Sequence, residues 1–217
     1  KVTGMDSRIG EKFLKSSIGF GGSCFKKDIL NLVYISRYYG LHEVADYWES
    51  VVKINSFQTE RIGDEIINIL EPQCSKSTVT ILGWAFKKDT NDSRESASIY
   101  LAYRLLTNNI NLHVYDPMVK ESLIKKDLTD LFKNNKKDNH EIKILLSKVK
   151  VYNNPYDSVL NSNIISVCTE WEEFIHYDWK KIYTIMKAPK WLFDGRNLLN
   201  KVNLDSIGFK TFFIGKS

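Results

Sequence analysis

Residues 18–28, with the sequence Ile-Gly-Phe-Gly-Gly-Ser-Cys-Phe-Lys-Lys-Asp, bring together residue types that can do covalent chemistry. Three glycines within four residues permit positive φ and a close approach of the backbone to a ligand. A helical pattern then begins, with Ser23 as the expected N-cap and Cys24 in the first turn. A thiol there lies at the positive end of the helix dipole, which together with Lys26 and Lys27 favours the nucleophilic thiolate.

Asp28 lies four residues after Cys24 and is therefore expected on the same face of the helix. A nucleophile and a carboxylate that can act as a general base, next to a glycine-rich turn, indicate covalent catalysis. The same residues are compatible with a glycine turn before an ordinary helix whose cysteine packs in the core, because most cysteines are structural. The local pattern leaves both interpretations open.

Composition limits the classes of protein to which the chain can belong. Its 217 residues provide room for one large domain, or for a medium one with a helical addition, and the 43% of hydrophobic residues favours a packed core over disorder. The net charge of +5 is mild and dispersed, which predicts no nucleic-acid partner but suits a small anionic ligand. No apolar run approaches membrane-spanning length and no secretory signal is seen, so no membrane partner is expected.

The chain has three cysteines, at positions 24, 74 and 168, and their spacing fits no metal site. An odd, sparse set argues against a disulfide framework and predicts a reducing, cytoplasmic compartment. Cys74 and Cys168 are expected to be inert, and the four histidines show no spacing typical of metal ligands. The first residues look like the tail of something longer, so we expect an upstream part to be missing.

The first part of the chain is predicted to be helical. Residues 1–17 are expected to form a short helical lead-in, followed by helices at about 24–39 and 42–70. The second helix carries more apolar positions than one buried stripe needs, so it either presents a surface to a partner or lies fully inside the protein. The turn-rich residues 71–77 mark a predicted boundary between a helical region, 1–72, and a second domain, 73–217.

In the second domain, short β-rich runs alternate with helical segments, which predicts an α/β fold with a Rossmann-like, doubly wound parallel sheet. Expected strands are residues 78–82, 111–115, 149–153, 164–169, 191–194 and 209–214, and expected helices are residues 93–107, 156–160 and 177–186. Residues 120–126 are interpreted as a solvated face, and residues 133–140 as a polar surface loop.

Ligands bind such a sheet at the carboxyl ends of its strands, which here directs attention to four segments. These are residues 83–94, 116–117, 169–171 and 194–196. The first of them carries Lys87, Lys88 and Arg94 before or at the start of a helix, where cations and backbone N–H groups can bind phosphate. No Gly-x-Gly-x-x-Gly is present, so the sheet suits a nucleoside diphosphate better than NAD. Asp116 is interpreted as a turn residue, with a ligand contact as the alternative, whereas Glu170 and Trp171 fit a site role and strand-end packing alike.

Five segments resemble the UDP-glucose 6-dehydrogenases of the UDP-glucose/GDP-mannose dehydrogenase family in order and spacing. They are residues 19–28, 83–96, 115–117, 168–171 and 193–197. The resemblance covers essentially the whole chain and these motifs together are highly specific. It implies the C-terminal portion of such an enzyme, with a central helical region used in dimerisation, a Rossmann-like domain that holds the UDP-sugar, and an NAD-binding domain further upstream.

The resemblance also implies an activity and roles for individual residues. Such enzymes oxidise UDP-glucose to UDP-glucuronate with two NAD⁺ through a cysteine thioester; Cys24 matches the nucleophile, and Asp28 the residue that assists hydrolysis. Arg94 matches a residue that reaches the cofactor NAD, and no metal is implied. Residues matching substrate contacts are Arg8, Phe13, Leu14, Lys15, Phe20, Gly21, Phe86, Lys87 and Arg196. Because Arg8 matches an arginine offered to a neighbouring subunit, a homodimer or higher homo-oligomer is expected.

Without the NAD-binding domain we expect the chain itself to have no dehydrogenase activity. A sister enzyme acting on GDP-mannose or on a UDP-N-acetylhexosamine is the near alternative, because physical reasoning does not fix the sugar. More distant alternatives are a non-catalytic nucleotide-sugar-binding module and a thiol redox sensor. A sensor needs a resolving cysteine near Cys24, and a binding module has no use for Asp28 beside the thiol.

Overall fold

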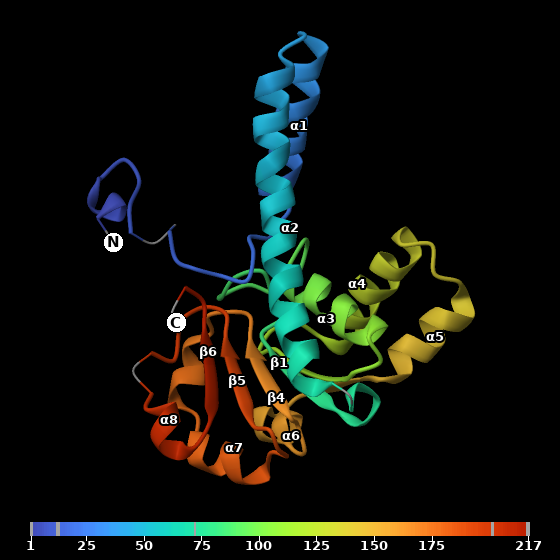
Figure 1. Cartoon of the computed structure of the whole chain (residues 1–217), viewed down its shortest axis with the longest axis vertical. Helices are drawn as coiled ribbons and strands as arrows, with labels where there is room; N and C mark the ends of the chain where they lie inside the picture. Colours follow the sequence, from blue (N-terminus) through green and yellow to red (C-terminus); the bar gives the residue numbers. More distant parts are fainter. Residues whose placement is uncertain (1, 12–13, 72, 201, 216–217) are drawn as a thin grey trace.

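The computed structural model describes residues 2–11, 14–71, 73–200 and 202–215. They form a six-stranded sheet covered by helices, from which a hairpin of two helices projects (Figure 1). The strands are β1 (Thr78–Leu82), β2 (Asn111–Tyr115), β3 (Val149–Tyr152), β4 (Ile164–Val167), β5 (Trp191–Asp194) and β6 (Lys210–Phe213). The α-helices are α1 (Phe25–Tyr38), α2 (His42–Leu70), α3 (Ala97–Thr107), α4 (Glu121–Asn134), α5 (Asn139–Ser147), α6 (Pro155–Val159), α7 (Trp179–Ile185) and α8 (Leu204–Ile207).

The sheet has the strand order β3-β2-β1-β4-β5-β6, and every neighbouring pair is parallel. The chain builds outward from β1 to β3 and then returns to place β4 on the other side of β1, so the order reverses between β1 and β4. β4 is buried along its whole length and β1 at all but its first residue. The predicted Rossmann-like, doubly wound α/β sheet is confirmed, and its ligand crevice is expected outside the carboxyl ends of β1 and β4.

Helix α4 was not predicted. Residues 120–126, interpreted as a solvated face, contain the start of this helix. Ile124, Leu128 and Phe132 are fully buried at a spacing of four residues, as expected for the core-facing stripe of a helix. Six lysines from position 120 to position 137 surround this stripe, and the polar composition that they give the segment concealed the helix.

Helix α5 shows that the predicted loop at residues 133–140 is wrong, because only residues 135–138 separate α4 from α5. α5 begins with a capping box in which Asp138 accepts from the backbone N–H of Glu141, while the Glu141 side chain accepts from the backbone N–H of Asp138. Each side chain satisfies a donor that a helix start leaves unpaired, so a polar stretch here starts a helix.

The predicted helical lead-in is also wrong, because its described part contains only a short 3-10 helix at Thr3–Met5. This helix ends at Asp6, whose backbone is extended (ψ 123°), and the chain then runs through turns to Gly10, which takes φ +79°. The lead-in therefore reaches the sheet as an irregular segment rather than as a helix.

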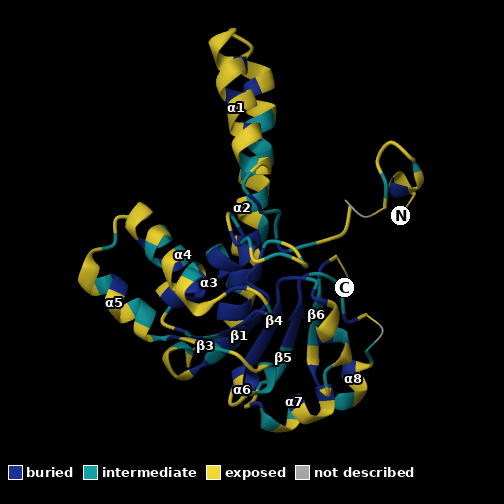
Figure 2. Ribbon diagram, turned by 180° about the vertical axis from the view of Figure 1, so that it is seen from behind, coloured by how far each residue is buried: buried dark blue, intermediate teal, exposed yellow. Residues whose placement is uncertain are grey.

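Helices α1 and α2 form the projecting hairpin, and Figure 2 shows it mostly in the colour of exposed residues. Near the sheet, α2 buries Ile62, Ile66 and Leu70 in the same core as the strands. Further out the hairpin exposes a series of large apolar side chains: Leu30, Leu32, Tyr34, Ile35, Tyr38, Tyr39, Leu41, Val44, Tyr47, Ile54 and Phe57. The interpretation of α2 as fully internal is therefore wrong. Among the described residues, no helix is both long and apolar enough to cross a membrane.

His113 of β2 lies half-buried under α6. Its Nδ1–H donates to the carbonyl oxygen of Ser158 (2.8 Å), which leaves Nε2 to accept from the hydroxyl of Tyr152 (3.3 Å). Burial lowers the pKa of His113 and the nearby Lys150 ammonium acts in the same sense, whereas the hydrogen bond to Ser158 opposes them. The ring is therefore held in its neutral form.

Because the pKa of His113 is lower in the folded chain, the unfolded chain binds more protons at this ring as the pH falls through its ordinary pKa of 6.5. The stability that His113 contributes is present above that pH and is lost on acidification. We expect His113→Gln to flatten the fall in urea-unfolding midpoint between pH 7.5 and 5.5. His42→Gln, at an exposed position, is the control. An unchanged slope for His113→Gln would contradict this assignment.

Candidate active site

Cys24 occupies the N-cap position of α1, one residue later than the predicted cap at Ser23. Its carbonyl oxygen accepts from the backbone N–H of Asp28 (2.8 Å), the hydrogen bond that closes the first turn, and its side chain caps nothing. The thiol is exposed, with the hydroxyl of Ser23 3.8 Å away. Cys24 and Asp28 lie on successive turns of one helix face, as predicted, and the interpretation of Cys24 as a core residue is wrong.

The segment before the cysteine is held against α2 by two side chains. Asn55 accepts from the backbone N–H of Phe20 (2.7 Å) and donates to the carbonyl oxygen of the same residue (3.1 Å). Thr59 donates to the carbonyl oxygen of Ile18 (2.9 Å), and its hydroxyl lies where a side chain on Gly19 would have to go. Together these contacts fix the backbone of the glycine turn against helix α2.

The glycine turn also packs closely on the loop that follows β1. The backbone N–H of Gly22 donates to the carbonyl oxygen of Arg94 (2.9 Å), and a Cβ on Gly22 would come within 3.0 Å of the Phe86 ring. A Cβ on Gly21 would lie 2.5 Å from the carbonyl oxygen of Glu95. Glycine is thus required at 21 by close approach of the Glu95 backbone and favoured at 22 by φ +91° and the nearby Phe86 ring. This packing carries Cys24 to the carboxyl end of the sheet.

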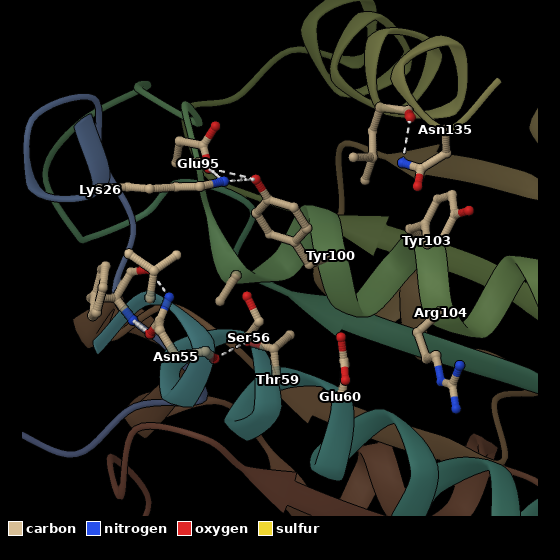
Figure 3. A pocket seen from close by; sticks show the side chains of 14 residues that line it. Lys26, Asn55, Ser56, Thr59, Glu60, Glu95, Tyr100, Tyr103, Arg104 and Asn135 are labelled. Carbon is tan, nitrogen blue, oxygen red and sulfur yellow. Dashed lines mark hydrogen bonds and ion pairs between the residues drawn. The ribbon is translucent and has the colours of Figure 1, made fainter. Parts of the chain in front are cut away.

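Lys26, two residues after the cysteine, ties the first turn of α1 to α3. Its Nζ lies 2.8 Å from Glu95 and 3.2 Å from the hydroxyl of Tyr100, which itself donates to Glu95. Partial burial works against the charge on Lys26, but the hydrogen bonds to Glu95 and Tyr100 outweigh it and raise the pKa of Lys26. Figure 3 shows these three side chains at one side of a cavity of about 300 Å³, with Asn55 and Thr59 of α2 among its lining residues.

Arg94 lies next to the cysteine turn with its side chain largely exposed. Both oxygens of Asp92 accept from its guanidinium, at 2.9 and 2.7 Å. This bidentate pairing raises the pKa of Arg94, with a smaller contribution from the Cys24 thiol in the same sense. The structure thus brings a fixed cation into electrostatic range of the thiol.

Asp116, at the end of β2, organises the loops that surround the crevice. Its buried carboxylate accepts from the backbone N–H groups of Trp84 (2.6 Å) and Ala85 (3.0 Å), which follow β1. It also accepts from Trp171 Nε1 (3.2 Å) and from the backbone N–H groups of Met118 (2.8 Å) and Val119 (2.9 Å). One side chain therefore holds the segments after β1, β2 and β4 together.

Besides Gly21, four of the predicted substrate-binding residues stand at the carboxyl edge of the sheet or on the glycine turn. Phe86 packs against the glycine turn, and Lys87 lies exposed with its Nζ 5.4 Å from the centre of the Phe86 ring. Arg196 follows β5, and its Nη2 lies 2.5 Å from a carboxylate oxygen of Glu170, which follows β4. The ring of Phe20, on the turn, packs against that of Phe25 of α1 in a tilted arrangement, with 4.7 Å between the ring centres.

Other predicted site residues are not brought together with these. Arg8 lies in the first turns of the chain, is 86% exposed and pairs with Asp6 (2.7 Å). Leu14 and Lys15 are exposed on the segment that leads to the glycine turn, and Phe13 lies outside the described residues. Their assignment to the substrate, and that of Arg8 to a neighbouring subunit, stays a prediction.

Sequence reasoning missed the residues that hold the site together. Asn55 and Thr59 are four residues apart on the apolar face of a long helix, and this pair of polar side chains at helical spacing was the available signal. Glu95, Tyr100 and Asp116 gave no such signal for their long-range contacts, because Lys26, Trp84 and Trp171 are distant from them in sequence.

The other ionisable groups give no indication of a second reactive centre. Burial raises the pKa of the Cys168 thiol to about 11, so this thiol stays protonated at neutral pH. Cys74 lies in the 3-10 helix Cys74–Lys76, where burial and the charge of Glu71 raise its pKa. Within the described ranges, no three His, Cys, Asp or Glu side chains gather in a group that could hold a metal ion.

The UDP binding domain of the UDP-glucose/GDP-mannose dehydrogenase family matches residues 80–201 of the chain, and the central domain of that family matches residues 1–57. The chain belongs to this family. The first match contains the loops that follow β1, β2, β4 and β5 at the carboxyl edge of the sheet, and the second contains the glycine turn, Cys24 and Asp28. The division of the chain at residues 72 and 73 stays a prediction.

Members of the family with full-length sequences are similar to the chain throughout its length. The UDP-glucose 6-dehydrogenase of Drosophila melanogaster is 43% identical over 216 residues, which are 100% of this chain and 44% of that protein. UDP-glucose 6-dehydrogenase 1 of Glycine max is 44% identical over 220 residues, 98% of this chain and 45% of that protein. The chain thus spans less than half the length of the curated relatives that it matches.

Solved structures show the same fold at lower sequence identity. A UDP-glucose dehydrogenase from Pyrobaculum islandicum superposes with a TM-score of 0.66 at 24% identity, covering 92% of this chain and 40% of that one. A GDP-mannose dehydrogenase from Pseudomonas aeruginosa superposes with a TM-score of 0.61 at 20% identity, covering 89% and 40%. At such identities the likeness establishes the fold and does not distinguish between sugar nucleotides.

Proposed function

We propose that this chain provides the UDP-sugar-binding surface and the catalytic cysteine of a UDP-glucose 6-dehydrogenase. The observation that carries the proposal is the docking of the glycine turn on the loop after β1, which places an exposed thiol at the ligand-binding edge of a doubly wound sheet. The identity of more than 40% to enzymes named UDP-glucose 6-dehydrogenase favours this reaction over those of sister enzymes.

In the proposed reaction Cys24 acts on carbon 6 of the sugar. Its thiolate adds to the carbonyl carbon of the 6-aldehyde, and the carbonyl oxygen takes a proton to complete a thiohemiacetal. If the hydride on carbon 6 of this adduct passes to an acceptor held outside this chain and the hydroxyl proton is lost, a thioester remains on Cys24. The carboxylate of Asp28, one helical turn away, then orients a water molecule. This water attacks the thioester carbonyl and releases the carboxylate product and the free thiol. Arg94 provides a positive charge next to the thiolate.

The remaining predicted residues would hold the sugar nucleotide. Lys87 and Arg196 offer cations to the diphosphate and sugar at the carboxyl edge, which suits a ligand carrying two negative phosphates. Phe20, Gly21 and Phe86 would contribute ring faces and an accessible backbone close to the reacting carbon. Leu14 and Lys15 precede this turn and would lie over the ligand.

The cofactor NAD, implied by the resemblance, does not fit the residues described. β1 leads into a long loop at residues 83–96 with a single glycine, and α3 begins with Ser96 as its cap instead of a free N-terminus facing a pyrophosphate. Of the predicted residues only Arg94 would reach such a cofactor. We therefore assign no step of hydride transfer to this chain, and we expect it to form no NADH from UDP-glucose by itself.

We further propose that the chain assembles as a homodimer or higher homo-oligomer in the cytoplasm. The exposed apolar side chains of α1 and α2 form a surface that a second copy would cover. A redox sensor is disfavoured because Cys74 and Cys168 lie outside the glycine turn in positions that raise their pKa. A non-catalytic binding module would not require the exposed thiol and the carboxylate one turn apart.

Isothermal titration calorimetry of the purified chain with UDP-glucose tests the proposed function. We expect saturable binding that Lys87→Met weakens by about tenfold, whereas Lys180→Met, at an exposed position of α7, changes nothing. GDP-mannose serves as the comparison ligand. Tighter binding of GDP-mannose would replace the assignment by that of a sister enzyme, and absence of binding by either ligand would contradict the proposal that this chain holds the sugar nucleotide.

A further inference from the structure

Glu170 and Arg196 form an unusually sheltered ion pair. The two charged groups lie 2.5 Å apart, with only 20% of the Glu170 side chain and 14% of the Arg196 side chain exposed. In the part of the chain that the structure describes, every other ion pair includes at least one side chain that is more than a third exposed. Such a pair is held in one geometry, because little solvent competes for either partner.

The pair stands where the sugar nucleotide is proposed to bind. Glu170 follows β4 and Arg196 follows β5, two neighbouring parallel strands, and β4 borders the point at which the strand order reverses. A carboxylate at this edge would repel a diphosphate unless a cation neutralised it. Its presence there is therefore best explained by an action on Arg196 rather than by a contact of its own with phosphate.

The backbone that carries Arg196 is fixed independently of its side chain. The buried carboxylate of Asp194 accepts from the backbone N–H groups of Arg196 (3.0 Å) and Leu199 (2.7 Å). Asn197 donates to the hydroxyl of Ser16 (2.7 Å), on the segment that leads to the glycine turn. Because the backbone is already held, only the side-chain torsions of Arg196 can still change the orientation of its guanidinium. The ion pair with Glu170 restricts these torsions.

We infer that Glu170 is a positioning residue for Arg196: its carboxylate forms an ion pair with Nη2 and leaves the other N–H donors of the guanidinium directed for the ligand. An arginine presents five N–H donors in a planar fork, so one carboxylate can orient the group without using all of them. The inference rests on the proposed function, because it takes Arg196 as a contact of the sugar nucleotide.

A double-mutant cycle on UDP-glucose binding tests this inference. We expect Glu170→Gln to weaken binding by about tenfold, because an amide holds the guanidinium less firmly than a carboxylate does. In the background of Arg196→Lys, the same change is expected to have no further effect. Glu172→Gln, next to the pair but 77% exposed, should bind as the unsubstituted chain does. Urea unfolding of each variant establishes that the fold is retained.

Each possible result of these binding measurements supports or contradicts the role inferred for Glu170. If the unsubstituted chain binds UDP-glucose and Glu170→Gln binds equally well, the inference is wrong and the proposed function stands. Tighter binding by Glu170→Gln would mean that the carboxylate competes with the ligand for Arg196, which also overturns it. Equal and additive losses in the double variant would show a contact of Glu170 that is independent of Arg196. Failure of the unsubstituted chain to bind would overturn the proposed function and this inference with it.

Discussion

Asp116→Ala is expected to lower the free energy of unfolding by about 4 kcal/mol, one of the largest losses that a single side chain of this fold can cause. The carboxylate accepts five hydrogen bonds, from Trp84, Ala85, Met118, Val119 and Trp171. Its removal leaves these donors unpaired in a buried place, and each unpaired donor costs about 1–3 kcal/mol before the loops relax. Urea unfolding at neutral pH measures the loss.

Asp130→Ala provides the matched control for Asp116. Asp130 is also an aspartate, but its side chain is 55% exposed on α4 and its partner is Lys126, at 3.4 Å. An exposed pair of this kind is worth about 0.5 kcal/mol or less. Asp116→Asn tests the need for two acceptor oxygens, because it replaces one carboxylate oxygen by an amide N–H₂ group, which cannot accept from the surrounding N–H donors. A loss for Asp116→Ala no larger than that for Asp130→Ala would show that water replaces the carboxylate.

The importance of Asp116 shows what a sequence pattern can and cannot predict. The pattern places Asp116 correctly at the end of a strand, where it was interpreted as a turn residue. Its role as an acceptor depends on Trp84 and Trp171, which are 32 and 55 positions away. Contacts between strand ends depend on the strand order, and the chain reverses that order between β1 and β4. Local spacing carries no information about which ends will meet.

The elements that were predicted well are those whose signal is local. The strands are short apolar runs between turns, and β1, β2 and β5 have the bounds that the pattern predicted. α2 also has its predicted bounds, because its apolar positions recur over many turns. α4 was missed because its buried stripe is only three residues, Ile124, Leu128 and Phe132, among many charged ones.

The same distinction applies to the candidate site. Cys24 and Asp28 belong to one helical turn, so their placement on one face followed from spacing alone. The residues that hold this segment in place, Asn55 on α2 and Glu95 before α3, come from other parts of the chain. Glu95 takes φ +54° to make its contacts, a left-handed conformation that glutamate rarely adopts and that no sequence pattern indicates. The reactive pair was predictable, and the support that holds it was not.

Cys24→Ser is expected to reduce the oxidation of UDP-glucose to UDP-glucuronate by about three orders of magnitude or more, because a hydroxyl cannot replace the thiolate as nucleophile. Since the chain spans less than half of its relatives, turnover is measured in a chimera. In it, this chain replaces the matching part of the Drosophila melanogaster UDP-glucose 6-dehydrogenase. Cys74→Ser, which removes a thiol outside the glycine turn, is the control and should retain activity.

Two measurements on the chain itself separate a loss of chemistry from a loss of binding. Cys24→Ser should bind UDP-glucose in the calorimeter about as well as the unsubstituted chain, because the diphosphate contacts are made by other residues. In the unsubstituted chain, saturating UDP-glucose should slow alkylation of Cys24 by iodoacetamide, read by mass spectrometry, and leave alkylation of Cys74 unchanged. A Cys24→Ser chimera that keeps a tenth or more of its activity would contradict covalent catalysis. Alkylation of Cys24 that is indifferent to the ligand would instead place the thiol outside the site, despite the glycine turn that carries it to the sheet edge.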